Sequence, residues 1–174
     1  MVEIARHMIG RQWGFLAALI VTLLAFGANA GTSHWQTIRD TGFGFTFSYP
    51  PALFDRLPDD EKPSFYYFAA PDGEAKFLAG AWHEPTVGTP QKFKQWLLDN
   101  AQGYDEVTYR PRGRTWFVLS GYRGEQIYYE KVMFSCGNQV VNVFAMVYPV
   151  AERKRFDPIV ERMEDQFHPA RRCP

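Results

Sequence analysis

The chain of 174 residues carries 19 basic and 19 acidic residues, so it lacks the strongly basic balance that is typical of nucleic-acid-binding proteins. Aromatic residues make up 17% of the sequence, which favours a packed domain over a disordered one. The sequence has no internal repeat, no low-complexity tract and no dividing linker. These properties predict one globular domain.

The N-terminus has the parts of a secretory signal peptide. Arg6 and Arg11 precede an apolar run from Phe15 to Phe26, and the small residues Ala28-Asn29-Ala30 follow. The run of 12 residues is shorter than the roughly 20 that a membrane-spanning helix needs. We predict a signal peptide over residues 1–30 that is cut between Ala30 and Gly31, with an uncleaved anchor as the alternative. The mature chain is then residues 31–174, with a formal charge of −1.

The first part of the mature chain has the pattern of strands. Residues 43–50 alternate phenylalanine with small or polar residues, and we expect residues 55–64 to form a loop. The runs 65–70 and 75–84 flank Asp72-Gly73, a dipeptide typical of a hairpin turn.

A helix is predicted next, because Thr89 is a suitable N-cap and Pro90 a suitable first helical residue. Gly103 is suited to the C-terminal end. The face that we expect to pack comprises Phe93, Trp96, Leu97 and Ala101.

The rest of the chain predicts four strands, over 106–110, 114–122, 125–135 and 139–149. A closing helix over about 151–167 follows, and Asp157-Pro158 either starts it or breaks a preceding turn. Its apolar stripe comprises Phe156, Ile159, Val160, Met163 and Phe167. Consecutive strands with two interposed helices indicate an α+β fold, an antiparallel sheet flanked by helices.

Cys136 follows the strand 125–135, and its possible roles are a reactive thiol, a metal ligand or half of a disulfide. A two-residue Gly137-Asn138 turn would pair Phe134 with Val141 and place Cys136 at the end of an aliphatic face. We expect the closing helix to fold back over that face, which brings Cys173 to Cys136. The opposite face, with Tyr129 and Tyr148, is then left for the helix that begins after Thr89.

In an oxidising compartment the two thiols should form a disulfide, which would stabilise the fold by about 4 kcal/mol at most. Free or intermolecular thiols are the alternative. A catalytic thiol needs a partner that lowers its pKa, and neither histidine nor lysine adjoins Cys136 in sequence, which leaves only a partner brought close by folding.

Other candidate sites are weaker. The mature chain has only His34, His83 and His168 as histidines, which are isolated and give no zinc-ligand spacing, so we expect no metal and no cofactor. His83-Glu84 is the most suggestive polar pair, and Ser120 is outside a nucleophile-elbow motif. A small secreted enzyme would therefore need a site assembled in space, around His83, Glu84, Ser120 or the tyrosines. A cleft with three mutually hydrogen-bonded titratable groups would favour that alternative.

Three stretches carry a resemblance to a known family: "GFGFTFSYPPALF", "GTPQKF" and "RFDPIVERMEDQF". In this order they resemble the PsbP-like α/β/α sandwich, a fold that includes the DcrB-like envelope proteins. The resemblance implies a non-catalytic accessory or binding protein, exported or lipid-anchored. The anchoring cysteine and any photosynthetic signature are missing, and no functional residue transfers by position.

The sequence thus favours a soluble envelope protein, periplasmic or secreted, that binds an unknown protein or small molecule without catalysis. It predicts no nucleic-acid partner and no membrane span after processing. The alternatives are the small exported enzyme described above and a structural factor for envelope integrity.

Overall fold

The computed structural model describes residues 34–58, 63–86, 88–100 and 104–174. The predicted signal peptide over residues 1–30 and its cleavage site between Ala30 and Gly31 lie outside the described residues. The helix positions predicted for Ala101 and Gly103 also lie outside them, as does the middle of the predicted loop over 55–64.

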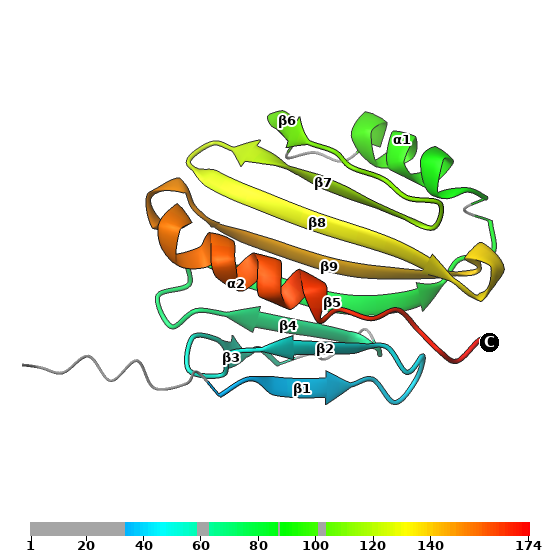
Figure 1. Cartoon of the computed structure of the whole chain (residues 1–174), viewed down its shortest axis with the longest axis horizontal. Coiled ribbons are helices and arrows are strands. Elements are labelled where there is room, and N and C mark those ends of the chain that lie inside the picture. The colour runs from blue at the N-terminus through cyan, green and yellow to red at the C-terminus, as the bar shows by residue number, and fades with distance from the viewer. Residues whose placement is uncertain (1–33, 59–62, 87, 101–103) are drawn as a thin grey trace, which may run out of the picture. The chain divides into compact units, whose positions relative to one another are not determined.

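The described residues form a large antiparallel sheet of seven strands and a separate ribbon of two (Figure 1). In order across the large sheet the strands are β3 (Asp55–Arg56), β4 (Phe65–Ala69), β5 (Lys76–His83), β9 (Val140–Pro149), β8 (Gln126–Ser135), β7 (Trp116–Arg123) and β6 (Glu106–Tyr109). The ribbon pairs β1 (Gln36–Arg39) with β2 (Thr46–Tyr49). The helices are α1 (Pro90–Asn100) and α2 (Arg153–Asp165). The predicted α+β class is confirmed.

Two tight turns fix the register of the sheet. At the β4–β5 turn, Oδ1 of Asp72 accepts the amide of Glu74 and Gly73 has a φ of 74°. At the β8–β9 turn, Gly137 and Asn138 have φ angles of 67° and 70°, the left-handed pair that a tight hairpin turn requires. Phe134 therefore pairs with Val141, as the sequence predicted.

One face of the large sheet is covered by α2 together with the β1–β2 ribbon (Figure 1). From α2, Phe156, Val160 and Met163 are buried in this core. From β2 and the residue before it, Phe47 and Phe45 are almost fully buried. Among the ring pairs of this face, Phe47–Phe68 packs edge to face and Phe144–Phe167 packs tilted, each with centroids 6.0 Å apart.

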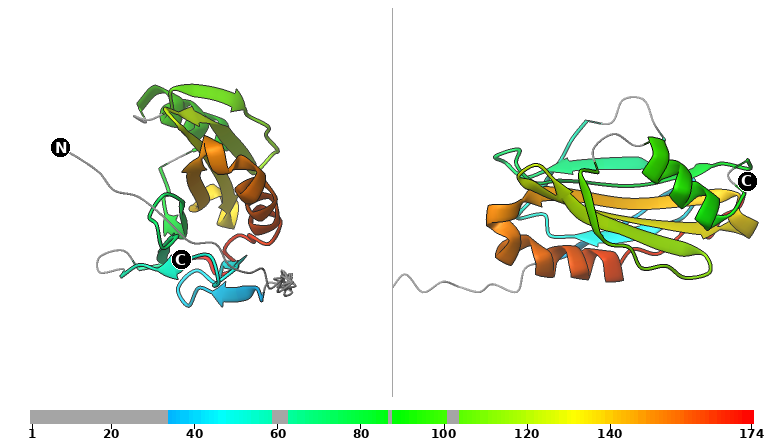
Figure 2. Two further views of the ribbon diagram at one scale, coloured as in Figure 1. Left: turned by 90° about the vertical axis from the view of Figure 1, so that its left-hand side faces the viewer. Right: turned by 90° about the horizontal axis from the view of Figure 1, so that it is seen from above.

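The opposite face carries α1, as the right-hand view of Figure 2 shows. The hydroxyl of Thr89 accepts the amide of Lys92 at 3.3 Å, which is the N-cap that the sequence predicted. Phe93 of α1 packs against Phe117 and Phe134 of the sheet. A helix is about 10 Å wide and strands are about 4.8 Å apart, so one helix covers about two strands. Among the residues that the structure describes, no helix covers the rest of this face.

The assignment of helices to faces was wrong. We expected α2 over the face of Phe134 and Val141, but α2 packs on the face of Phe144 and Tyr148, and α1 takes the other. The reason lies at Cys136, whose φ of 53° takes it out of strand geometry. Its side chain therefore does not continue the alternation of β8 and packs on the α2 side.

Three local expectations also differ from the structure. Trp96 was expected in the packing face of α1, but 55% of it is exposed. Asp55–Arg56 lies in the predicted loop yet forms the short strand β3. Pro158 neither starts α2 nor breaks a turn, because it lies inside the helix. Asp157 beside it accepts hydrogen bonds from Tyr148 and Arg153, which hold the turn that Pro158 weakens.

Candidate functional site: an aromatic groove on the α1 face

The part of the α1 face that lies over β4, β5 and β9 is hollowed into a groove of about 800 Å³. We call it the aromatic groove. The described residues that line it are Pro63, Phe65, Tyr67, Leu78, Trp82, Glu130, Val143 and Ala145. Its volume lies in the range of small-molecule sites, about 300–1,000 Å³.

Aromatic side chains form one wall of the groove and continue onto α1. The ring of Phe65 stacks on Tyr67 with centroids 6.2 Å apart and on Trp82 with centroids 5.9 Å apart. Trp82 meets Phe93 at 6.2 Å, and Phe93 stacks on Trp96 at 5.7 Å. A continuous row of five rings thus runs from β4 to the exposed Trp96.

Gly80 makes room for this row. It pairs with Phe65 across the β4–β5 ladder, and a Cβ at Gly80 would lie 2.5 Å from the Phe65 ring. No real Cβ contact is that short, so only glycine lets the ring lie flat across β5. The absence of a side chain at Gly80 therefore places an aromatic ring at the edge of the groove.

Glu130 is the charged side chain among the described lining residues. It projects from the middle of β8, between Leu119 of β7 and Ala145 of β9. Its Oε2 accepts a hydrogen bond from the phenol of Tyr104, whose ring packs at a tilt against Tyr128 with centroids 4.7 Å apart. Burial raises the pKa of Glu130, and the bond from Tyr104 lowers it in part.

Glu130 is not neutralised by a cation within the described residues. The ion pairs found there join Lys131 to Glu164, Arg153 to Asp157 and Arg155 to Glu152. Within the same residues, Oε1 of Glu130 accepts no hydrogen bond. The groove therefore combines an aromatic wall with a carboxyl group that retains acceptor capacity.

A smaller cavity of about 300 Å³ lies on the opposite face, between α2 and the strands β6 to β9. We call it the tyrosine cavity, because Tyr109, Tyr122, Tyr129 and Tyr148 line it together with Ser120 and Arg153. Asp157 accepts the phenol of Tyr148 at 2.8 Å and Nε of Arg153 at 3.0 Å. Within the described residues, hydrogen bonds link Tyr148 and Arg153 only through Asp157, so these three titratable groups form a chain and are not mutually bonded.

The catalytic candidates of the sequence do not converge. Ser120 lies in the tyrosine cavity, but its hydroxyl donates to the carbonyl of Tyr128 at 2.8 Å. His83 is exposed at the end of β5, which β9 and β8 separate from the strand of Ser120. Glu84 accepts the hydroxyl of Thr86 in an exposed turn. Burial and the hydrogen bond to Asp157 raise the pKa of Tyr148, which holds its proton at neutral pH.

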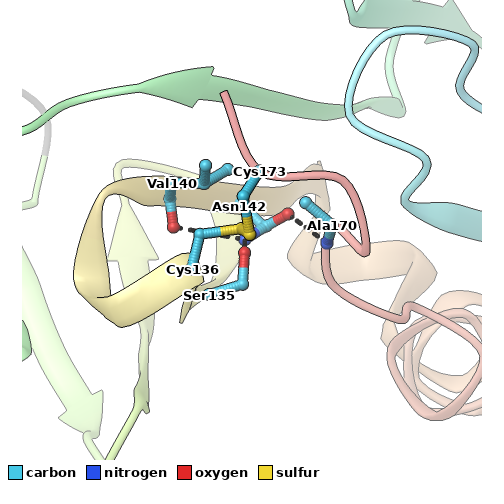
Figure 3. The surroundings of a disulfide bond; sticks show 6 residues. All are labelled: Ser135, Cys136, Val140, Asn142, Ala170 and Cys173. Atoms are coloured by element: carbon cyan, nitrogen blue, oxygen red, sulfur yellow. Dashed lines mark hydrogen bonds between the residues drawn. A yellow bond between two sulfur atoms is a disulfide. The ribbon is translucent and has the colours of Figure 1, made fainter.

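Cys136 and Cys173, the pair predicted from the sequence, are joined by a disulfide with Cα atoms 5.5 Å apart (Figure 3). The tail that carries Cys173 is also fixed by hydrogen bonds. The amide of Ala170 donates to Oδ1 of the fully buried Asn142 at 2.7 Å, and Nδ2 of Asn142 donates to the carbonyl of Met133 at 3.1 Å. The disulfide therefore closes a segment that Asn142 already positions.

The described residues contain no group of three or more histidine, cysteine, aspartate or glutamate side chains placed to hold a metal ion. Within the same part of the chain, no helix is long and apolar enough to cross a bilayer.

The sequence reasoning missed both Glu130 and Asn142. The signal for each is present, since both are polar residues at positions where the strand alternation places buried apolar side chains: Glu130 between Tyr128 and Val132, and Asn142 between Val140 and Phe144.

Comparisons with known proteins show which solved structures share this fold. No family model and no curated protein sequence matches the chain. The solution structure of PsbP (CyanoP) from Synechocystis sp. PCC 6803 matches with a TM-score of 0.56 and 16% identity, over 84% of this chain and 98% of that one. The crystal structure of the Saccharomyces cerevisiae Ran-binding protein Mog1p matches with a TM-score of 0.54 and 11% identity, over 78% and 95%. The chain therefore has the PsbP-like fold that the sequence motifs suggested.

Proposed function

We propose that this chain is an exported, non-catalytic binding module whose partner occupies the aromatic groove. The observation that carries the proposal is the groove itself: about 800 Å³ on the sheet face that α1 leaves open, with aromatic rings on one wall and Glu130 on another. Apolar pockets with few polar groups are the common form of ligand sites. The solved structures of this fold include one protein described as Ran-binding, which supports a binding role over catalysis.

Export is supported by two independent features. The first is the signal-peptide pattern of residues 1–30. The second is the Cys136–Cys173 disulfide, a bond that persists in oxidising compartments and is rare in the cytosol. Together they favour the periplasm or the external medium.

The test of export uses the full chain, expressed with its own N-terminus in a bacterium that has a periplasm. We expect the protein in the periplasmic or external fraction. Its intact mass should match a chain that starts at Gly31 and should be two hydrogens lower than the mass of the reduced form, because the two cysteines are joined. Full-length protein retained in the cytosol would contradict export.

The test of the groove compares the purified protein with an Ala145→Phe variant by native mass spectrometry. Ala145 lies half-buried on the groove floor, so a phenylalanine there fills the groove without entering the core of the α2 face. We expect a bound species on the wild type that is missing from the variant. Lys154→Ala, on the exposed side of α2, is the matched control and should retain it. If the wild type and both variants all carry the bound species, the aromatic groove is not its binding site.

A catalytic function at the tyrosine cavity is the second candidate. It is favoured by the chain of Tyr148, Asp157 and Arg153 beside Ser120. Both oxygens of Asp157 are engaged there, and the Ser120 hydroxyl is bonded to the backbone of the sheet. The bond from Tyr148 of β9 to Asp157 fixes α2 to the sheet, which is a structural role. A hydrolytic activity that Asp157→Asn abolishes would overturn the binding proposal in favour of this one.

A further inference from the structure

We infer that the aromatic groove selects a small organic cation, an ammonium group attached to an apolar body. The inference rests on the proposed function and specifies its ligand. It follows from the two kinds of side chain that face the same space: the aromatic wall of Phe65, Tyr67 and Trp82, and the carboxyl group of Glu130.

The aromatic wall binds the apolar body of the ligand. The flat faces of aromatic rings pack well against apolar and aromatic surfaces, and the ladder row Tyr67–Leu78–Ala145–Glu130 sets this wall three strands away from the carboxyl group that would hold the ammonium group. Tyr67, Phe65 and Trp82 stack in a row, and all three are half-buried. Rings of the same size on the α2 face, such as Phe45 and Phe47, are almost fully buried and accept no ligand.

Glu130 supplies the complementary charge. It lines the groove, and Oε1 accepts no hydrogen bond within the described residues, while Oε2 is bonded to Tyr104. The neighbours of Glu130 across the sheet are Leu119 and Ala145, which bring no charge. A cationic ligand would provide both the charge and the donor that this carboxyl group lacks, whereas an anion would be repelled.

The apolar floor determines the other part of the ligand. Leu78, Val143 and Ala145 offer hydrocarbon surface between the aromatic wall and Glu130. The volume of about 800 Å³ suits a molecule of drug-like size. An aromatic or branched apolar body would bury this surface and place its ammonium group beside Glu130.

The experiment uses three probes of one shape and different charge: 2-naphthylmethylamine, which is protonated at neutral pH, neutral 2-naphthylmethanol and anionic 2-naphthoate. Binding to the mature, oxidised protein is measured by calorimetry, and the site is mapped by amide chemical shifts in the NMR spectrum. We expect the amine to bind about tenfold more tightly than the alcohol, with the naphthoate weakest. The shifts should cluster on β4, β5 and the middle of β8 and β9.

Glu130→Gln keeps the shape of the side chain and removes its charge. In this variant we expect the amine to bind no more tightly than the alcohol, while the alcohol retains its wild-type affinity. Trp82→Ala should weaken the amine and the alcohol together. Glu161→Gln, an exposed glutamate on α2, is the matched control and should change neither affinity. Circular dichroism and the Tm confirm that each variant is folded.

The outcomes separate this inference from the proposed function. If the alcohol binds in the groove as tightly as the amine, the cation preference is wrong and the groove remains a binding site. If no probe binds, or if Glu130→Gln leaves the amine preference intact, the inference is also wrong. The proposed function is then decided by the Ala145→Phe comparison alone.

Discussion

The phenol of Tyr104, in the segment before β6, donates a hydrogen bond to Oε2 of Glu130 in β8. Burial is the main reason that the pKa values of both groups are raised, and Glu130 raises that of Tyr104 further. Tyr128 also interacts with Glu130, and its pKa is raised to about 12, mainly by burial. Glu130 thus lies among neutral phenols, in a position that disfavours its charged form.

This position predicts that stability falls as the pH rises. The pKa of Glu130 is raised in the folded state above its ordinary value of 4.5, so the folded protein binds this proton more tightly than the unfolded chain does. The contribution is present below pH 4.5 and is lost as the pH rises through the folded-state pKa. Glu130→Gln should therefore raise the Tm at pH 7, and the gain should shrink towards pH 4. A variant that melts below the wild type at pH 7 would contradict this account.

Removal of the disulfide should destabilise the fold. The bond links residues 37 positions apart, and the chain-entropy model gives an upper estimate of about 4 kcal/mol for a loop of that size. Urea unfolding of the Cys136→Ser, Cys173→Ser double variant should show a lower midpoint that does not respond to dithiothreitol. The wild type should shift to a similar midpoint when it is reduced. Equal midpoints with and without reductant would show that the tail is held by its other contacts.

Asn142→Leu should destabilise the fold more than expected for two side chains of similar volume. The change leaves the amide of Ala170 without its acceptor in a buried site. An unsatisfied buried group of this kind destabilises a protein by about 1–3 kcal/mol. Hydrogen exchange of the Ala170 amide should accelerate together with the loss in unfolding free energy. Ser135→Ala removes only one acceptor of the Asn142 side chain and is the milder control.

Gly80→Ala should disturb the groove through Phe65. The new Cβ would lie 2.5 Å from the Phe65 ring, so the ring must move and the stacking on Trp82 is lost. Overpacking of this kind destabilises by about 1–3 kcal/mol. A double-mutant cycle is the sharp measurement, because Gly80→Ala should be nearly neutral in a Phe65→Ala background. Additive effects would show that the ring is not the obstacle.

Much of the fold follows from local pattern. The alternation in β8 and β9 and the Gly137-Asn138 turn fix the pairing of Phe134 with Val141, because turn type and register are set by neighbouring residues. Thr89 likewise marks the start of α1. The helices were assigned to the wrong faces because that prediction continued the alternation of β8 through Cys136, whose φ of 53° breaks it and is not encoded in composition or spacing.

The groove was beyond prediction for a different reason. Phe65 and Trp82 share the β4–β5 hairpin, but Glu130 is far from both in sequence and lines the same groove only because β9 lies between β5 and β8. A pattern within one strand shows that Glu130 is unusual, but not that an aromatic wall faces it. The tyrosine cavity could not be predicted either. Ser120 lies on a strand and Asp157 on a helix, and no pattern in the sequence indicates that these two elements meet.

The pairing of β5 with β9 is a seam between two parts of the chain that are each built from local hairpins, residues 55–83 before it and 106–149 after it. The aromatic groove straddles this seam, with Phe65 and Trp82 on the early side and Glu130 and Ala145 on the late side. A ligand bound in the groove would contact both parts and would link them non-covalently. A bound ligand should therefore slow the opening of the β5–β9 ladder, so the resistance of the protein to unfolding by force should depend on whether the groove is occupied.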